Sequence, residues 1–336
     1  MQFHDYRTHY QICKHRNPRE PLVSQGPEEF YRQYLKGLEL RSRSMFGAKL
    51  QDYDPFSPLL MQAELDWHTA LRPYYNLWPS IIPALTGLKL DADASHFKLP
   101  LDHLLIRFPV RDNPLTWTDK QGLVRTVRVV LAENVNLHSG KGEPGKPRLV
   151  FQNGDNEFAV KRGMAFWIDG GETIGVDPTK PHDTAGHLQS LMYKHLVCDE
   201  GKTIEWSFDH IPAHPSSDFG LHYPDQIVRD VARIVCTLCL MAEDKELVEP
   251  IVLKADEDKW DKSHDPSLVE KAKRRGNYGF NVGRDVEVVP HVRSACPAAL
   301  YWTGQGRKIP RIRFRRGSVV HRKRLASVPT GFFDKE

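Results

Sequence analysis

The chain has 336 residues, with 47 Lys and Arg against 43 Asp and Glu and an apolar fraction of 40%. These proportions are ordinary for a globular protein, and the length suffices for two domains or one large α+β body. No run approaches the roughly 20 apolar residues of a transmembrane helix, so the sequence excludes a membrane-spanning protein. The first residues show neither a secretory signal nor a lipidation motif, and we expect a cytoplasmic location.

The cysteines do not resemble a disulfide framework, because their number is odd and they are widely scattered. They are Cys13, Cys198, Cys236, Cys239 and Cys296. The spacing of Cys236 and Cys239 matches a redox or half-zinc motif, but both lie in an apolar helical run and no second pair exists. Reduced, buried core cysteines are therefore expected.

Residues 1–95 are predicted to form a helical N-terminal region. Pro27 and two glutamates begin one helix, which continues with aromatic and leucine residues at helical spacing. A second helix is predicted over 59–71, before Pro73. The aromatic cluster that follows is interpreted as core rather than as a ligand site, because aromatic residues dominate core packing. It comprises Trp67, Tyr74, Tyr75 and Trp78.

Residues 96–255 are predicted to form an α+β body of mixed strands. Apolar runs separated by turn residues indicate strands near 104–106, 124–131, 149–151 and 158–168. Alternation of apolar and polar residues predicts another strand over 204–208. A helix over 187–197, capped by Asp183, is a further interpretation.

The region 223–242 gives the clearest helical pattern in the chain. Ile227, Val231, Ile234, Leu238 and Met241 recur every three or four residues after a Pro-Asp start. We expect a central helix on which the mixed β body packs.

The last sixth of the chain concentrates positive charge. Residues 271–324, the basic segment, carry fifteen Lys and Arg against two acidic residues, so the segment has a net charge of +13 and the rest of the chain −9. Such a local excess indicates a polyanionic partner or a solvated tail. Aromatic residues and apolar runs interrupt the segment, which favours a folded module. A short helix is predicted near 267–275 and a basic C-terminal β module over 266–330.

Within this module, Arg311, Arg313 and Arg315 alternate with apolar residues, as expected for one face of a strand. The repeat of about 7 Å resembles the spacing of phosphates along a nucleic-acid strand, and an indole can stack on an unpaired base. The predicted nucleic-acid-binding residues are Arg307, Lys308, Arg311, Arg313, Arg315, Arg316, Arg322, Lys323, Arg324 and Trp302. Two alternatives stay open: pairing with the acidic surface of the same chain, and binding of an acidic partner protein.

Two stretches of the basic segment resemble a known family. They are Pro290-His-Val-Arg293 and Tyr301-Trp-Thr-Gly-Gln-Gly-Arg307. The pattern is similar to the C-terminal signature of largely uncharacterised bacterial, plasmid and phage proteins, among them the type V-A anti-CRISPR protein that suppresses production of the type V effector nuclease. The signature positions are His291, Arg293, Trp302, Gly304 and Gly306. This chain has Ser294-Ala-Cys-Pro297 where the family has Arg-Gly-His-Trp.

The resemblance implies a non-enzymatic regulator of gene expression, or an anti-defence factor, that engages a nascent polypeptide, its message or a ribonucleoprotein. Specificity belongs to sites rather than folds, so the resemblance does not assign an anti-CRISPR role. No cofactor is expected.

The alternative is a metal-dependent nuclease. His and carboxylate residues gather in one polar loop, where they could bind a divalent ion that activates water. They are Asp209, His210, His214, Asp218 and His222. Prolines and a glycine between them exclude one continuous helix. Because no other catalytic motif occurs, we expect a binding protein more than an enzyme.

Overall fold

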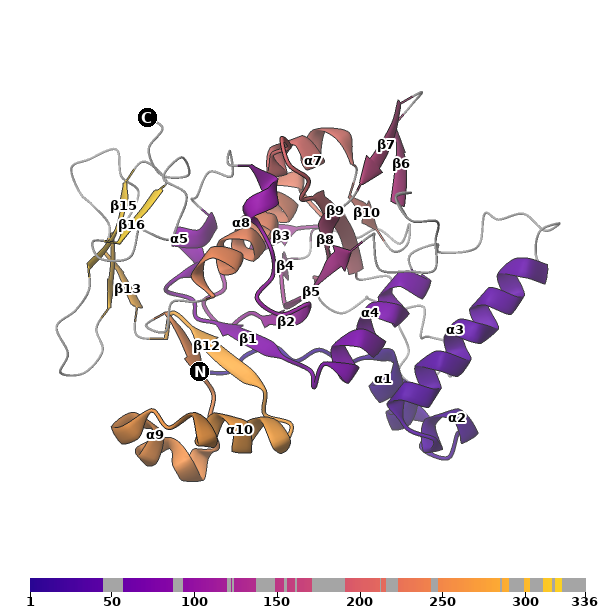
Figure 1. The fold of residues 1–336 in the computed structure, drawn as a ribbon, viewed down its shortest axis with the longest axis horizontal. Coiled ribbons are helices and arrows are strands. Elements are labelled where there is room, and N and C mark those ends of the chain that lie inside the picture. Colours follow the sequence, from indigo (N-terminus) through magenta and orange to yellow (C-terminus); the bar gives the residue numbers. More distant parts are fainter. Residues whose placement is uncertain are drawn as a thin grey trace.

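The chain folds into an α+β structure, as the sequence predicts (Figure 1). The computed structural model describes residues 1–44, 57–86, 93–119, 122, 124–136, 149–153, 156–160, 162–170, 191–211, 213–215, 223–242, 247–284, 286–289, 299–302, 311–315 and 318–321. Within these ranges, no helix is long and apolar enough to cross a membrane.

An eight-stranded mixed sheet is the centre of the fold. Its strands, in spatial order, are β10 (His214–Pro215), β9 (Leu191–Val197), β8 (Arg162–Asp169), β5 (Val129–Asn136), β2 (His103–Arg107), β1 (Tyr74–Leu77), β12 (Gly279–Val282) and β11 (Val248–Pro250). Strand β1 pairs in parallel with both β2 and β12, and the other pairs are antiparallel. The sheet therefore joins residues about two hundred positions apart in the chain.

One face of the sheet packs against α8 (Asp225–Met241), with α5 (Ile82–Thr86) in the same core. Leu104 and Ile106 of β2 are fully buried in this core together with Val231 and Leu238 of α8. The predicted helix over 223–242 is thus confirmed as the central helix.

The opposite face packs against α4 (Ser57–Thr69) and the N-terminal segment. Leu105 of β2 belongs to this second core, which includes Leu60 and Trp67 of α4. Burial on both faces explains why β2 is a continuous apolar run instead of an alternating one. Of the predicted aromatic core cluster, Trp67 and Tyr75 are buried, and Tyr74 and Trp78 are partly buried.

The remaining elements lie outside the central sheet. The N-terminal helices are α1 (His9–Arg16), α2 (Pro21–Ser24) and α3 (Pro27–Ser44), and the two helices before β12 are α9 (Glu257–Ser263) and α10 (Pro266–Arg274). Two hairpins pair β3 (Thr116–Thr118) with β4 (Val124–Thr126) and β6 (Leu149–Asn153) with β7 (Asn156–Val160). Short 3-10 helices are η2 (Ala94–His96) and η3 (Lys254–Asp256), and α7 (Ile204–His210) follows β9.

A separate four-stranded antiparallel sheet forms the C-terminal module. Its strands are β13 (Val286–Val289), β14 (Ala299–Trp302), β15 (Arg311–Arg315) and β16 (Ser318–His321), in that spatial order. In Figure 1 this sheet and α3 lie toward opposite ends of the longest axis.

Two local predictions are wrong. Residues 204–208 form the helix α7, because the Thr203 side chain accepts a hydrogen bond from the backbone N–H of Trp206 and caps the first turn. Residues 191–197 form β9, in which every side chain is buried. A strand buried on both faces does not alternate between apolar and polar residues, so its sequence pattern does not distinguish it from a buried helix.

The central sheet takes strands from all three regions predicted from the sequence: β1 from 1–95, β12 from 266–330 and the others from 96–255. The division into three domains stays a prediction. Among the cysteines that the structure describes, Cys198 and Cys236 are buried and Cys13 and Cys239 are partly buried. Burial raises the pKa of the Cys236 thiol well above its usual value, as expected for a core residue.

Candidate functional site

The three alternating arginines of the basic segment lie on a strand. Arg311, Arg313 and Arg315 occupy alternate positions of β15, which pairs with β14 on one side and β16 on the other. Trp302 is the last residue of β14. The strand predicted from the sequence is therefore present at these positions.

The register of this sheet places few acidic residues beside the arginines. Arg313 pairs with Ala299 and Val320, and Arg315 pairs with Ser318. Arg311 pairs with Tyr301, whose other partner is Glu287, so Glu287 lies two strands away from Arg311. That separation is about 10 Å at the usual spacing of neighbouring strands. At the described register positions, no acidic residue is a direct cross-strand partner of these arginines.

Several predicted binding residues lie outside the described residues. They are Arg307, Lys308, Arg316, Arg322, Lys323 and Arg324, with the family-signature positions His291, Arg293, Gly304 and Gly306. For these residues the sequence predictions stand as predictions.

Helix α10 presents a second group of cations from the same basic segment. The Asp265 side chain caps its start by accepting from the backbone N–H of Ser267. Gly276, at φ 80°, ends it: its N–H donates to Lys273, and the next N–H donates to Ala272. Cations in the last turn of a helix also suit the helix dipole, which is a structural reason for their presence.

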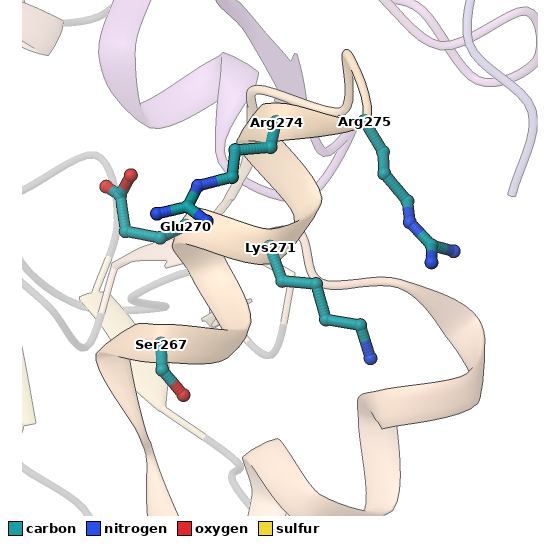
Figure 2. Close-up of a pocket in the computed structure, with 5 residues that line it drawn as sticks. All are labelled: Ser267, Glu270, Lys271, Arg274 and Arg275. Atoms are coloured by element: carbon teal, nitrogen blue, oxygen red, sulfur yellow. The ribbon is translucent and has the colours of Figure 1, made fainter.

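A shallow pocket lies over α10, lined by Ser267, Glu270, Lys271, Arg274 and Arg275 (Figure 2). Figure 2 shows Arg274 and Glu270 on one side of the helix and Lys271 and Arg275 on the other. Lys271 binds the buried Asp256 at 2.8 Å and lowers its pKa. Arg274 and Arg275 are exposed, and neither forms an ion pair with a residue that the structure describes. These two guanidinium groups are accessible to a ligand.

The arginines of α8 are paired within the chain. Arg229 binds Asp225 at 2.5 Å and also binds Glu205 of α7, and its guanidinium lies 4.4 Å from the Phe208 ring centre. Arg233 binds Asp230 at 2.8 Å. Internal neutralisation, the alternative raised for the basic segment, therefore does occur on this helix.

The loop proposed for the nuclease alternative is only partly described. Asp209 and His210 lie at the end of α7 and His214 begins β10, whereas Asp218 and His222 lie outside the described residues. The His210 ring stacks on Trp206 at 4.3 Å, and its Nδ1 is 2.9 Å from the Trp206 carbonyl oxygen. Asp209 is 4.0 Å from Arg229. These contacts give both residues structural roles at the end of α7.

A different His and carboxylate cluster lies between α4 and the sheet. Asp66 of α4, His103 of β2 and Glu133 of β5 each offer one atom to a group in which all three atoms lie within 4.8 Å of one another. His103 and Glu133 are cross-strand partners, which is why residues thirty positions apart meet. The sequence does not predict this cluster, because no local spacing connects residues from three separate elements.

The pKa values of His103 and Glu133 are both raised by their surroundings. Burial and the charge of Asp66 raise the pKa of Glu133, against the opposing effect of His103. Burial also works against a charged His103 ring, but the neighbouring carboxylates, Glu133 first, raise its pKa overall. The Nδ1 of His103 is buried without a hydrogen-bond partner, at 3.6 Å from the nearer oxygen of Glu133.

A fully buried carboxylate, Glu64, lies two residues before Asp66 on α4, and its oxygens are hydrogen-bonded. It accepts hydrogen bonds from the Tyr6 hydroxyl at 2.5 Å and the Tyr31 hydroxyl at 2.7 Å, and from the backbone N–H of His9 at 3.0 Å. The His9 ring also contacts it at 3.0 Å. Burial opposes its ionisation, but these partners hold the pKa of Glu64 below its usual value.

One buried lysine also has a structural explanation. The Nζ of Lys194 donates to the carbonyl oxygens of Ser207 and Ile211 at the end of α7. Burial lowers its pKa to about 8. The ammonium group compensates the orphan carbonyls and the dipole of this helix end, so the position stabilises the fold.

Two comparisons with known proteins bear on the family of this chain. A scan against models of protein families found no match, and a search of curated proteins found none either. The resemblance carried by residues 290–293 and 301–307 stays a prediction from the sequence.

Proposed function

We propose that the protein binds nucleic acid, alone or within a ribonucleoprotein, through the basic C-terminal module. The observation that carries the proposal is the placement of Arg311, Arg313 and Arg315 at alternate positions of β15, with no acidic residue as a direct cross-strand partner among the residues that the structure describes. Guanidinium groups bind phosphate in a planar, bidentate way, and successive contacts along a strand follow a polyanion. The protein acts in this proposal as a binding protein without catalysis.

Arg274 and Arg275 support the proposal from a second element. They belong to the same basic segment, they are exposed, and the described residues offer them no ion pair. In contrast, the α8 arginines already have carboxylate partners. A polyanion can therefore bind Arg274 and Arg275 without first breaking an ion pair to a described residue, and this lowers the electrostatic cost of binding.

The resemblance to the family that includes the type V-A anti-CRISPR protein suggests a biological role for this binding. A regulator of gene expression that acts on a message or on a nascent polypeptide in the cytoplasm needs such a surface. Expression of the protein beside a type V effector, with the effector's level as readout, tests this narrower role. An unchanged effector level contradicts the role without affecting nucleic-acid binding.

The proposal is tested by fluorescence anisotropy with labelled single-stranded RNA and single-stranded DNA. We expect saturable binding that weakens as salt rises, and a loss of at least about tenfold when Arg311, Arg313 and Arg315 are all changed to Ala. A charge-matched control changes Lys14, Arg19 and Lys36 to Ala, which are exposed in the N-terminal helical region. Equal losses in both variants would show only a general charge effect and contradict a specific surface.

An acidic partner protein is the second candidate, favoured by the same charges. Pull-down from a lysate before and after nuclease treatment separates the two. A partner that survives digestion supports a protein contact, and one that disappears supports the nucleic-acid proposal.

A further inference from the structure

The cluster of Asp66, His103 and Glu133 is partly buried and differs from the buried Glu64 site on the same helix in how its polar atoms are satisfied. Glu64 accepts hydrogen bonds from several donors. By contrast, the Nδ1 of His103 is buried and makes no hydrogen bond, and Glu133 is too far from it, at 3.6 Å, to accept one. A buried nitrogen that has an ion pair at 3.6 Å but no hydrogen bond is costly unless another group completes the arrangement.

The chemistry of the three side chains matches a metal ion. One imidazole nitrogen and two carboxylate oxygens, all within 4.8 Å of one another, surround a common point. Imidazole and carboxylate are ligands for Zn²⁺ and Mn²⁺, and a set of three protein ligands leaves room for water. The ion would also neutralise two carboxylates that otherwise repel each other.

The surroundings fit the same interpretation. The side chain of Gln62 donates to both oxygens of Asp66, at 2.9 and 3.0 Å, and so orients this carboxylate from the preceding turn of α4. The side chains of His103 and Glu133 are 20% and 17% exposed, which leaves a path from solvent. Two of the three positions lie on paired strands, so their separation is fixed by the sheet.

We propose that Asp66, His103 and Glu133 form a binding site for one divalent transition-metal ion of the Zn²⁺ or Mn²⁺ class. This inference rests on residues outside the basic segment and is independent of the proposed nucleic-acid surface. Either can fail without the other.

Calorimetric titration of the chelator-treated full chain with Zn²⁺, and separately with Mn²⁺, tests the site. We expect one ion per chain, with affinity reduced at least about tenfold in His103→Asn and in Glu133→Gln. The matched control is His15→Asn, an exposed histidine of α1, which should bind as the unaltered chain does. Absence of saturable binding for both ions overturns the proposal and leaves an ion pair between His103 and its carboxylates.

Cobalt substitution identifies the ligands even if a variant folds poorly. Co²⁺ bound by nitrogen and oxygen gives weak visible bands, and Co²⁺ bound by thiolate gives intense near-ultraviolet charge transfer. We expect the weak bands in the unaltered chain and in Asp66→Ala a loss of them with unchanged circular dichroism. Thiolate charge transfer, or bands that survive all three substitutions, overturns the assignment to this cluster.

Discussion

Charged residues in the body of the protein and in the basic segment differ in whether the chain supplies their partners. On α8, Arg229 and Arg233 bind carboxylates of α7 and α8, and in the N-terminal region Glu64 is surrounded by donors. On α10, Arg274 and Arg275 have no ion pair among the described residues, and β15 places its arginines beside neutral cross-strand partners. The paired charges are already neutralised within the chain, and cations without an ion pair are available to a partner.

The largest expected effect is at Glu64, the most completely paired charge of the body. Glu64→Gln removes the negative charge but leaves Tyr6, Tyr31 and His9 around the site, and we expect a loss of about 3–5 kcal/mol in the free energy of unfolding. Urea denaturation followed by circular dichroism measures it. The affinity of the folded variant for nucleic acid, measured without urea, should not change. A loss of affinity would mean that the Glu64 site also contributes to nucleic-acid binding.

The same site predicts a pH dependence. Because the folded pKa of Glu64 lies below its usual value of 4.5, the folded state binds fewer protons, and this stabilisation is fully present above pH 4.5. It is lost as pH falls through the lower folded pKa. Urea midpoints measured from pH 6 downward should fall less steeply in Glu64→Gln than in the unaltered chain. Identical slopes would contradict an ionised Glu64.

The next-largest effect is expected at the three arginines of β15. Changing Arg311, Arg313 and Arg315 to Ala should reduce the salt dependence of nucleic-acid binding, with the slope of log K against log salt falling by about 2 for a single strand. The urea midpoint of the body should stay within error, since its core lies in the other sheet. A large loss of stability with an unchanged slope would mean that the arginines are structural.

Arg229→Ala should have the opposite pattern: a loss of stability without an effect on nucleic-acid binding. Because Arg229 is three-quarters buried by Phe208 and its carboxylate partners, we expect about 1 kcal/mol of destabilisation. The salt slope of nucleic-acid binding should not change. A lower slope would place α8 within the binding surface and remove the distinction between the two regions.

The smallest expected effect is at α10. Arg274→Ala with Arg275→Ala should weaken nucleic-acid binding a few-fold, with a slope change of about 1. Thermal denaturation should show almost no change beyond the small contribution of cations at a helix end. Unaltered affinity would restrict the surface to the C-terminal sheet.

Local chemistry explains which elements could be predicted from the sequence. Helix α8 and strand β15 follow from repeating patterns within one segment, and both are present. The alternation of Ile204, Trp206 and Phe208 predicts a strand where helix α7 forms, although Thr203, three residues before Trp206, is a capping signal. Strand β9 lies where the sequence predicts a helix, because all of its side chains are buried, Lys194 and His195 included, and they do not alternate between apolar and polar.

Long-range pairing explains what could not be predicted. The parallel pairing of β1 with β12 joins residues 74–77 to 279–282, and nothing in either segment specifies its partner. The Asp66, His103 and Glu133 cluster depends on the pairing of β2 with β5 and on the packing of α4, so it has no sequence motif. The loop of 209–222 did have a motif-like composition, yet Asp209 and His210 contact Arg229 and Trp206 instead.

The most direct test of the central claim is hydrogen–deuterium exchange with and without a single-stranded RNA or DNA oligonucleotide. We predict slower exchange on binding in peptides that cover 266–275 and 311–321, with no change in peptides that cover α8 and the N-terminal helices. Protection centred on α7 and α8, or binding with no protection of 311–321, would contradict the assignment of the unpaired cations as the binding surface.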